Sequence, residues 1–208
     1  MPNLRARLLR TIHDAYPETF EGLYPSKVLG EDVFDGVKPH PNAVLNFIIQ
    51  EKVTSALPMA YYMAVRRGSD SLMDTRLPPS ATLSGQTLRS ATRGLIALRE
   101  MELKESYKIA FLIKDFTKNI GCDSQECISW KGGISDAVVI SACQEVFDRI
   151  TGSAAGGTRI LQVLSASEFA ENTVRVFCQV CMGKIQAAHA EVRRKAWAAL
   201  PEVFGLKV

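Results

Sequence analysis

Apolar residues in this chain recur every three or four positions over several long stretches, a spacing that places side chains on one face of an α-helix. In the clearest stretch, steps of four and three alternate through Val174, Cys178, Cys181, Ile185, Ala188 and Val192. A strand would instead alternate apolar and polar residues, and the chain contains few such alternations. The pattern predicts a mainly α fold, a single helical domain of about five or six helices around one core.

Proline and glycine residues divide the chain into segments. Residues 1–20 read as an amphipathic N-terminal helix that stops before Pro17, because a residue preceding proline is disfavoured in the helical region. Prolines and glycines, which interrupt helices, are frequent in residues 21–40, and this predicts a linker or loop. Residues 41–208 are expected to form the helical domain. The apolar stripe of the first helix would pack on the core or serve as a contact surface, and it consists of Leu4, Leu8, Leu9 and Ile12.

Within the helical domain, a helix is expected from Pro41, with a break and restart at Leu57-Pro58. A long helical segment follows. It carries one apolar stripe at Leu88, Ala91, Leu95 and Leu98, and a second at Leu103, Tyr107, Ala110 and Phe111. A further helix is expected at about 134–150, and the last one from near Ser167 to the Leu200-Pro201 step.

The composition is that of a globular chain with a core, with 47% hydrophobic and 23% charged residues. A net charge of +3 is too small to favour nucleic acid or a membrane as the main partner. The apolar stretches, such as Val44–Ile49, are far shorter than the roughly 18 residues of a membrane span. The opening residues also lack the apolar run of a secretory signal. We therefore expect an intracellular protein, cytoplasmic or nuclear.

The sequence contains no assembled catalytic motif. The glycine-rich stretch TGSAAGGT lacks the lysine of a phosphate-binding P-loop, and no GxSxG nucleophile motif is present. No catalytic role is assigned to the three histidines: His40 lies in a Pro-His-Pro turn, His13 is expected to face solvent, and His189 lies on the last helix. These observations favour a non-enzymatic protein.

Two groups of charged residues have an ordinary structural interpretation. Glutamates at 100, 102 and 105 alternate with cations at 99, 104 and 108, which predicts a solvated helix face stabilised by pairs three and four residues apart. The basic cluster Arg193–Lys195 lies near the end of the last helix, where cations complement the helix dipole. Weak nucleic-acid binding through this cluster is kept as an alternative function.

Four cysteines form two pairs, Cys122 with Cys127 and Cys178 with Cys181. Four thiolates are the ligand set of a structural tetrahedral zinc site. The separation between the pairs is much longer than the roughly 12–20 residues of compact zinc modules, and buried cysteine also acts as a small hydrophobe. Cys143 is assigned to the core. A thiol-dependent enzyme that uses Cys178 or Cys181 is a further alternative.

Several segments occur together in an order typical of one protein family. They are PNLRARLLRTIHDAYPETF, HPNAVLNFIIQEKVTSALPMAYY, the spaced Cys122 and Cys127, FCQVC, and the closing RRKAWAALPEVFGL. On these segments the chain resembles the region that follows the BTB/POZ domain in the BTB-domain proteins of basidiomycete fungi. The closing motif of that family is matched by Trp197, Leu200, Pro201, Phe204, Gly205 and Leu206.

The resemblance implies a helical interaction or adaptor module. Its partner would be a protein that the sequence does not identify, or a second copy of the chain. The recurring cysteine pairs of the family favour a structural zinc ion held by Cys122, Cys127, Cys178 and Cys181. The BTB fold itself would be expected before Met1, so the dimerisation and cullin-docking roles of that fold are not carried over.

Overall fold

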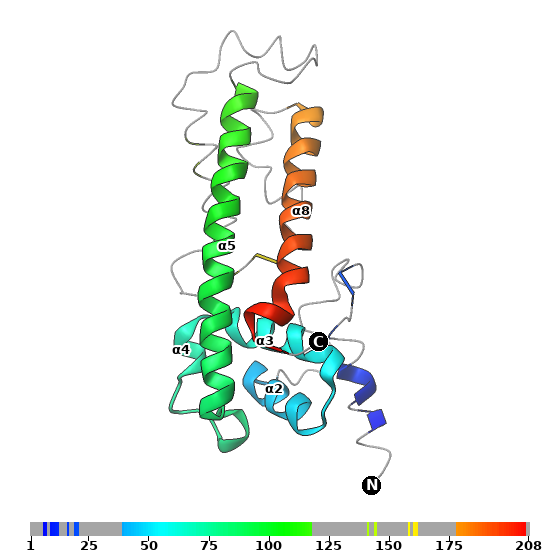
Figure 1. Ribbon diagram of the computed structural model, residues 1–208, viewed down its shortest axis with the longest axis vertical. Helices are drawn as coiled ribbons and strands as arrows, with labels where there is room; N and C mark the ends of the chain where they lie inside the picture. The colour runs from blue at the N-terminus through cyan, green and yellow to red at the C-terminus, as the bar shows by residue number, and fades with distance from the viewer. Residues whose placement is uncertain are drawn as a thin grey trace. The chain divides into compact units, whose positions relative to one another are not determined.

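The computed structural model describes residues 6–7, 9–12, 16, 19–20, 39–117, 141, 144, 158, 160–161 and 178–206, without the side chains of 110–117. Every regular element in these ranges is a helix (Figure 1). The α-helices are α2 (Pro41–Gln50), α3 (Leu57–Val65), α4 (Ser69–Leu72), α5 (Gly85–Thr117) and α8 (Gln179–Val203). Two 3₁₀ helices lie between them, η2 (Thr54–Ala56) and η3 (Pro79–Ala81). The predicted mainly α, helical domain is confirmed.

The chain divides into two compact units. The first unit joins residues 1–97 to the closing residues 198–208, and the second unit comprises residues 98–197. Most of the linker expected at 21–40 lies outside the described residues. Of the N-terminal stripe, Ile12 is buried and Leu9 is half-buried, while Leu4 and Leu8 are not described.

Helix α2 begins where the sequence predicted, with Pro41 in its first turn and His40 as its N-cap. Its buried face consists of Asn42, Val44, Leu45 and Ile48. At its other end, the N–H of Val53 donates to the carbonyl of Ile48 (3.1 Å), and that of Lys52 donates to the carbonyl of Ile49 (3.2 Å). These two bonds form a Schellman cap, which places Lys52 at a positive φ of 56°.

Helix α3 is the central element of the first unit. It begins at Leu57-Pro58, as predicted, because the N–H that proline lacks would have no partner in the first turn of a helix. It packs against α2 and α4. Its buried residues occur on all sides, as expected of a helix that is surrounded by other elements, and they are Met59, Ala60, Tyr61, Tyr62, Ala64 and Val65.

The two halves of α5 differ in how well the sequence predicted their buried face. In the first half the expected stripe is confirmed at Ala91, Leu95 and Leu98, which are buried, while Leu88 is half-buried. In the second half the predicted stripe is wrong at its first two members, because Leu103 is 39% exposed and Tyr107 is 58% exposed. The side chains of its other members, Ala110 and Phe111, lie outside the described residues. Leu103 lies five positions after Leu98, or roughly 140° around the helix.

Polar side chains occupy the buried face in this second half of α5. Glu102 and Ser106 have no exposed surface, and Ile109 continues the same face. The prediction that Glu102 belongs to a solvated face is therefore wrong. Its carboxylate Oε2 accepts a hydrogen bond from Nη1 of Arg99 at 2.8 Å, and the Ser106 hydroxyl donates to its carbonyl oxygen at 2.6 Å.

Helix α8 begins later and ends later than predicted. Cys178 is not helical, so no continuous helix runs from Ser167 through this position. At the other end the helix continues through Pro201, and its termination requires Gly205, at φ +68°. The N–H of Leu206 donates to the carbonyl of Pro201 (2.8 Å), and that of Gly205 donates to the carbonyl of Glu202 (2.9 Å), which is again a Schellman cap.

Phe204, the last residue before this glycine, contributes to the core of the first unit. Its side chain is fully buried, and its ring stacks on that of Tyr61 in α3 with centroids 5.0 Å apart. Aromatic pairs at such distances stabilise a core by more than their buried area alone. The closing motif of the chain is therefore a helix cap and a core anchor of the first unit.

Candidate functional site

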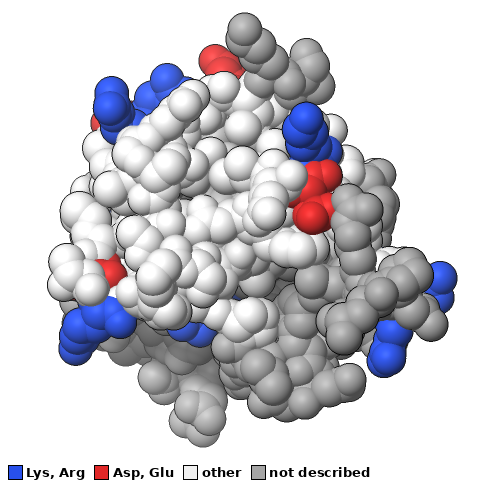
Figure 2. All heavy atoms as spheres, turned by 90° about the horizontal axis from the view of Figure 1, so that it is seen from below, with Lys and Arg blue, Asp and Glu red and all other residues white. Residues whose placement is uncertain are grey.

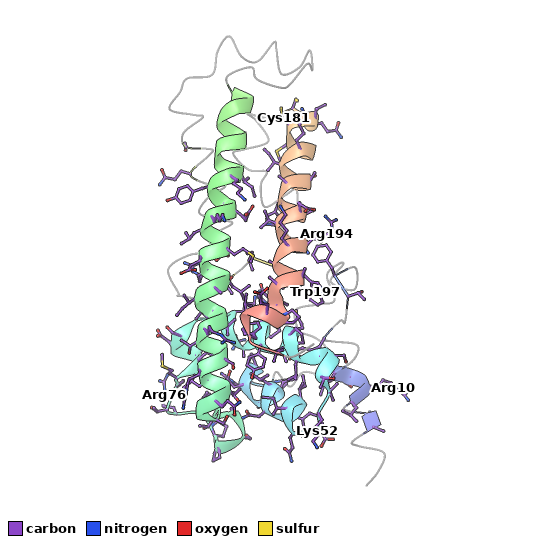
Figure 3. All side chains as sticks on the ribbon, viewed as in Figure 1. Arg10, Lys52, Arg76, Cys181, Arg194 and Trp197 are labelled. Carbon is purple, nitrogen blue, oxygen red and sulfur yellow. The ribbon has the colours of Figure 1, made fainter. Side chains whose placement is uncertain are left out.

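The structure describes half of the predicted zinc ligand set. Cys178 is half-buried immediately before α8, and Cys181 is fully buried in its first turn (Figure 3). They are three residues apart, the first just before the helix and the second in its first turn. Cys122 and Cys127 lie outside the described residues, as does Cys143. Within the described ranges, no three His, Cys, Asp or Glu side chains form a group that could hold a metal ion.

The basic cluster of α8 is divided between interior and surface. Arg193 is 1% exposed, and its Nε donates to the carbonyl oxygen of Leu161 at 3.0 Å. Arg194 and Lys195 are exposed, and both form ion pairs with Glu191 on the same helix. Figure 3 shows Arg194 and Trp197 further along α8 from Cys181. Because one cation is buried and two share an acid, the three do not form a continuous basic surface.

His189 lies one turn before Arg193 and is also buried. Burial and the nearby Arg193 guanidinium lower the pKa of His189 to about 4, so the imidazole is neutral at pH 7. The second unit thus has an interior with several polar side chains, which the spacing of hydrophobic residues did not predict. Its described polar members are Glu102, Ser106, Thr158, His189 and Arg193.

The exposed face of α5 carries large apolar side chains. Ile96 is 56% exposed, Leu103 is 39% exposed and Tyr107 is 58% exposed. Their spacings of seven and four residues place them within about 40° of one another around the helix. We call these three residues the α5 strip. Sequence reasoning missed the strip because Leu103 and Tyr107 were assigned to the core, although their spacing from Ile96 could have indicated a second apolar face.

Charged residues flank the α5 strip. Glu100 and Lys104 are exposed beside it, and Lys108 forms an ion pair with Glu105. Both signs of charge are present, as in the polar rim that surrounds the apolar centre of many protein interfaces.

Figure 2 shows where the charged side chains lie on the face that is seen from below. Lysine and arginine side chains lie toward its edges, and its middle is occupied by uncharged residues. A nucleic-acid surface would instead concentrate its cations. The face drawn there has no such concentration among its described atoms.

None of the described helices combines the length and the apolar character needed to cross a bilayer. Comparisons of the chain with family models, with curated proteins and with solved structures find no match.

Proposed function

We propose that this protein is a non-enzymatic protein–protein interaction or adaptor module, of the kind implied by its resemblance to the region after the BTB domain in fungal BTB-domain proteins. The observation that supports this proposal is the α5 strip. Apolar side chains that recur along one exposed helix face commonly mark a contact surface, and a helix face is a usual element of recognition between proteins. The expected partner is another protein chain in the cytoplasm or nucleus.

The two alternative functions receive less support from the described residues. A reactive thiol should be accessible and acidic, whereas Cys181 is fully buried and Cys178 is half-buried. Nucleic-acid binding through residues 193–195 would require exposed cations, whereas Arg193 is buried.

The experiment compares partner capture by three forms of the full chain. In the test variant, Leu103→Gln and Tyr107→Gln make the strip polar at positions that are already exposed. In the control variant, Lys104→Gln changes an exposed residue beside the strip. Each form is cross-linked in cells of the source organism, purified, and compared by quantitative mass spectrometry, with circular dichroism as the check on folding.

The proposal predicts a set of cross-linked proteins that the wild type and the control share and that the folded test variant loses. Light scattering on each purified form shows whether the occupant is a second copy of the chain. Capture of the same proteins by all three forms would contradict a role for the strip. Catalytic turnover that depended on one side chain would contradict the non-enzymatic function.

We also propose that a zinc ion is held by Cys122, Cys127, Cys178 and Cys181. Support comes from the two described members, which lie one turn apart where α8 begins. Elemental analysis should find one zinc per chain, lost on substitution of any of the four by serine and retained in Cys143→Ser, the matched control. A folded wild-type protein without zinc would refute this proposal.

A further inference from the structure

The backbone N–H groups in the first turn of α2 all donate to acceptors on one residue, His40. Pro41 has no N–H to satisfy. The N–H of Asn42 donates to Nδ1 of His40 (3.3 Å), and those of Ala43 and Val44 donate to the His40 carbonyl oxygen (2.9 and 3.2 Å). An N-cap is usually Ser, Thr, Asp or Asn, whose side-chain oxygens accept at any ordinary pH. An imidazole nitrogen accepts only when it carries no proton.

Two charged groups face the His40 imidazole from the elements packed around it. Arg67 follows α3, and Asp74 lies just beyond α4. Partial burial and the Arg67 charge lower the pKa of His40, and the Asp74 carboxylate opposes that effect in part. Arg76 already occupies both oxygens of this carboxylate, through Nε to Oδ1 (2.9 Å) and Nη2 to Oδ2 (3.0 Å). An imidazolium at position 40 would therefore have to compete with Arg76 for the Asp74 carboxylate.

The capped turn is also joined to the neighbouring short helix. The Asn42 side chain is fully buried, and its amide Nδ2 donates to the carbonyl oxygen of Ser71 in α4 at 3.4 Å. Opening of the first turn of α2 would pull Asn42 away from this bond. A change at His40 would in this way be transmitted from the start of α2 to α4.

We propose that His40 is an acid-sensitive latch, whose neutral imidazole holds the first turn of α2 closed and whose protonation releases that turn and its link to α4. Protonation converts Nδ1 from an acceptor into a donor, and it places a cation at the positive end of the helix dipole. The closed form is fully favoured above pH 6.5, and the advantage is lost as the pH falls below that value, through the lower pKa of the folded state.

Amide hydrogen exchange tests the latch through the protection factors of residues 42–45 at pH 7.5 and pH 5.0. Two variants of the full chain accompany the wild type. His40→Asn supplies a cap that does not titrate, and His40→Ala removes the side-chain cap at both pH values. Protection in the wild type should fall several-fold at pH 5.0, whereas it should stay high in His40→Asn and low in His40→Ala.

The comparison between wild type and His40→Asn removes contributions from other titrating groups, His189 included. Equal protection of the wild-type amides at both pH values would overturn the latch. A loss of protection in His40→Asn as large as that of the wild type would overturn it as well, because the pH dependence would then originate elsewhere.

Discussion

Phe204 lies so close to Gly94 of α5 that the glycine could not carry a side chain without a shift in the ring. A Cβ built on Gly94 would overlap the Cδ1 and Cε1 atoms of Phe204. The phenyl ring has little freedom to move aside, because it is fully buried and stacked on Tyr61. The close approach explains why a glycine, a poor helix former, occupies the interior of a long helix.

The same substitution should therefore have opposite effects at two helical glycines. Gly94→Ala should lower the free energy of unfolding by about 1–3 kcal/mol through overpacking. Gly183→Ala in α8, where a Cβ would meet nothing within 4 Å, should raise it by about 0.5–1 kcal/mol through helix propensity. Urea denaturation of both variants checks this pair, and a stabilised Gly94→Ala would contradict the packing described.

The cap of α2 leads to a second prediction. Lys52 adopts a left-handed backbone conformation that glycine adopts without steric cost. Lys52→Gly should raise the free energy of unfolding by about 0.5–1 kcal/mol. Lys52→Ala retains the Cβ and should change it by only a few tenths of a kcal/mol, so thermal melts of the two variants separate backbone strain from the loss of the lysine charge. A destabilised Lys52→Gly would argue against the left-handed conformation.

The two neighbouring arginines of α8 should respond very differently to substitution. Arg193→Met should lower the free energy of unfolding by about 1–3 kcal/mol, because the buried hydrogen bond from Arg193 Nε to the carbonyl oxygen of Leu161 is lost. Arg194→Met should change it by less than about 0.5 kcal/mol, since its ion pair with Glu191 is exposed. Chemical denaturation provides the measurement, and equal effects would contradict the burial of Arg193.

His189 should make the stability of the second unit depend on pH. Its pKa is about 4 in the folded protein, against an ordinary 6.5, so the unfolded chain binds the proton more tightly between these values. Stability is therefore highest above pH 6.5 and falls as the pH is lowered toward 4, by about 2 kcal/mol between pH 7 and pH 5. Denaturant titrations of wild type and His189→Gln measure this, and the variant should lack that part of the pH dependence. An identical slope in both would show that His189 does not titrate in this way.

The sequence predicted the helices better than the faces that they bury. Proline at 41 and 58 located the starts of α2 and α3, because a missing N–H is tolerated only in a first turn. The predicted burial of Leu95 and Leu98 was confirmed, because apolar side chains that recur at helical spacing share one face, and that face is buried. Beyond Leu98 the buried face of α5 is partly polar, and hydrophobic spacing alone does not detect such a face.

For the predicted zinc site, the sequence did not show which distant residues come together. The spacing of Cys178 and Cys181 indicates that they lie near each other in the chain, but which distant residues approach them depends on tertiary packing that the spacing does not encode. For residues 193–195, the sequence placed three adjacent cations near the end of the last helix, but it did not indicate that Arg193 is buried and donates to a carbonyl 32 residues away. His40 was not expected to be a catalytic base, and the pattern Pro-His-Pro did not reveal its role as a cap.

The first unit is discontinuous in the sequence, and this has a consequence for its synthesis. Residues 1–97 emerge from the ribosome long before residues 198–208, which complete the same unit. During this interval Tyr61 lacks its stacking partner and Gly94 faces the space that Phe204 will fill. Domains generally fold as units, with the N-terminal parts first. The contacts of Tyr61 and Gly94 with Phe204 therefore form only after residues 98–197 have been made.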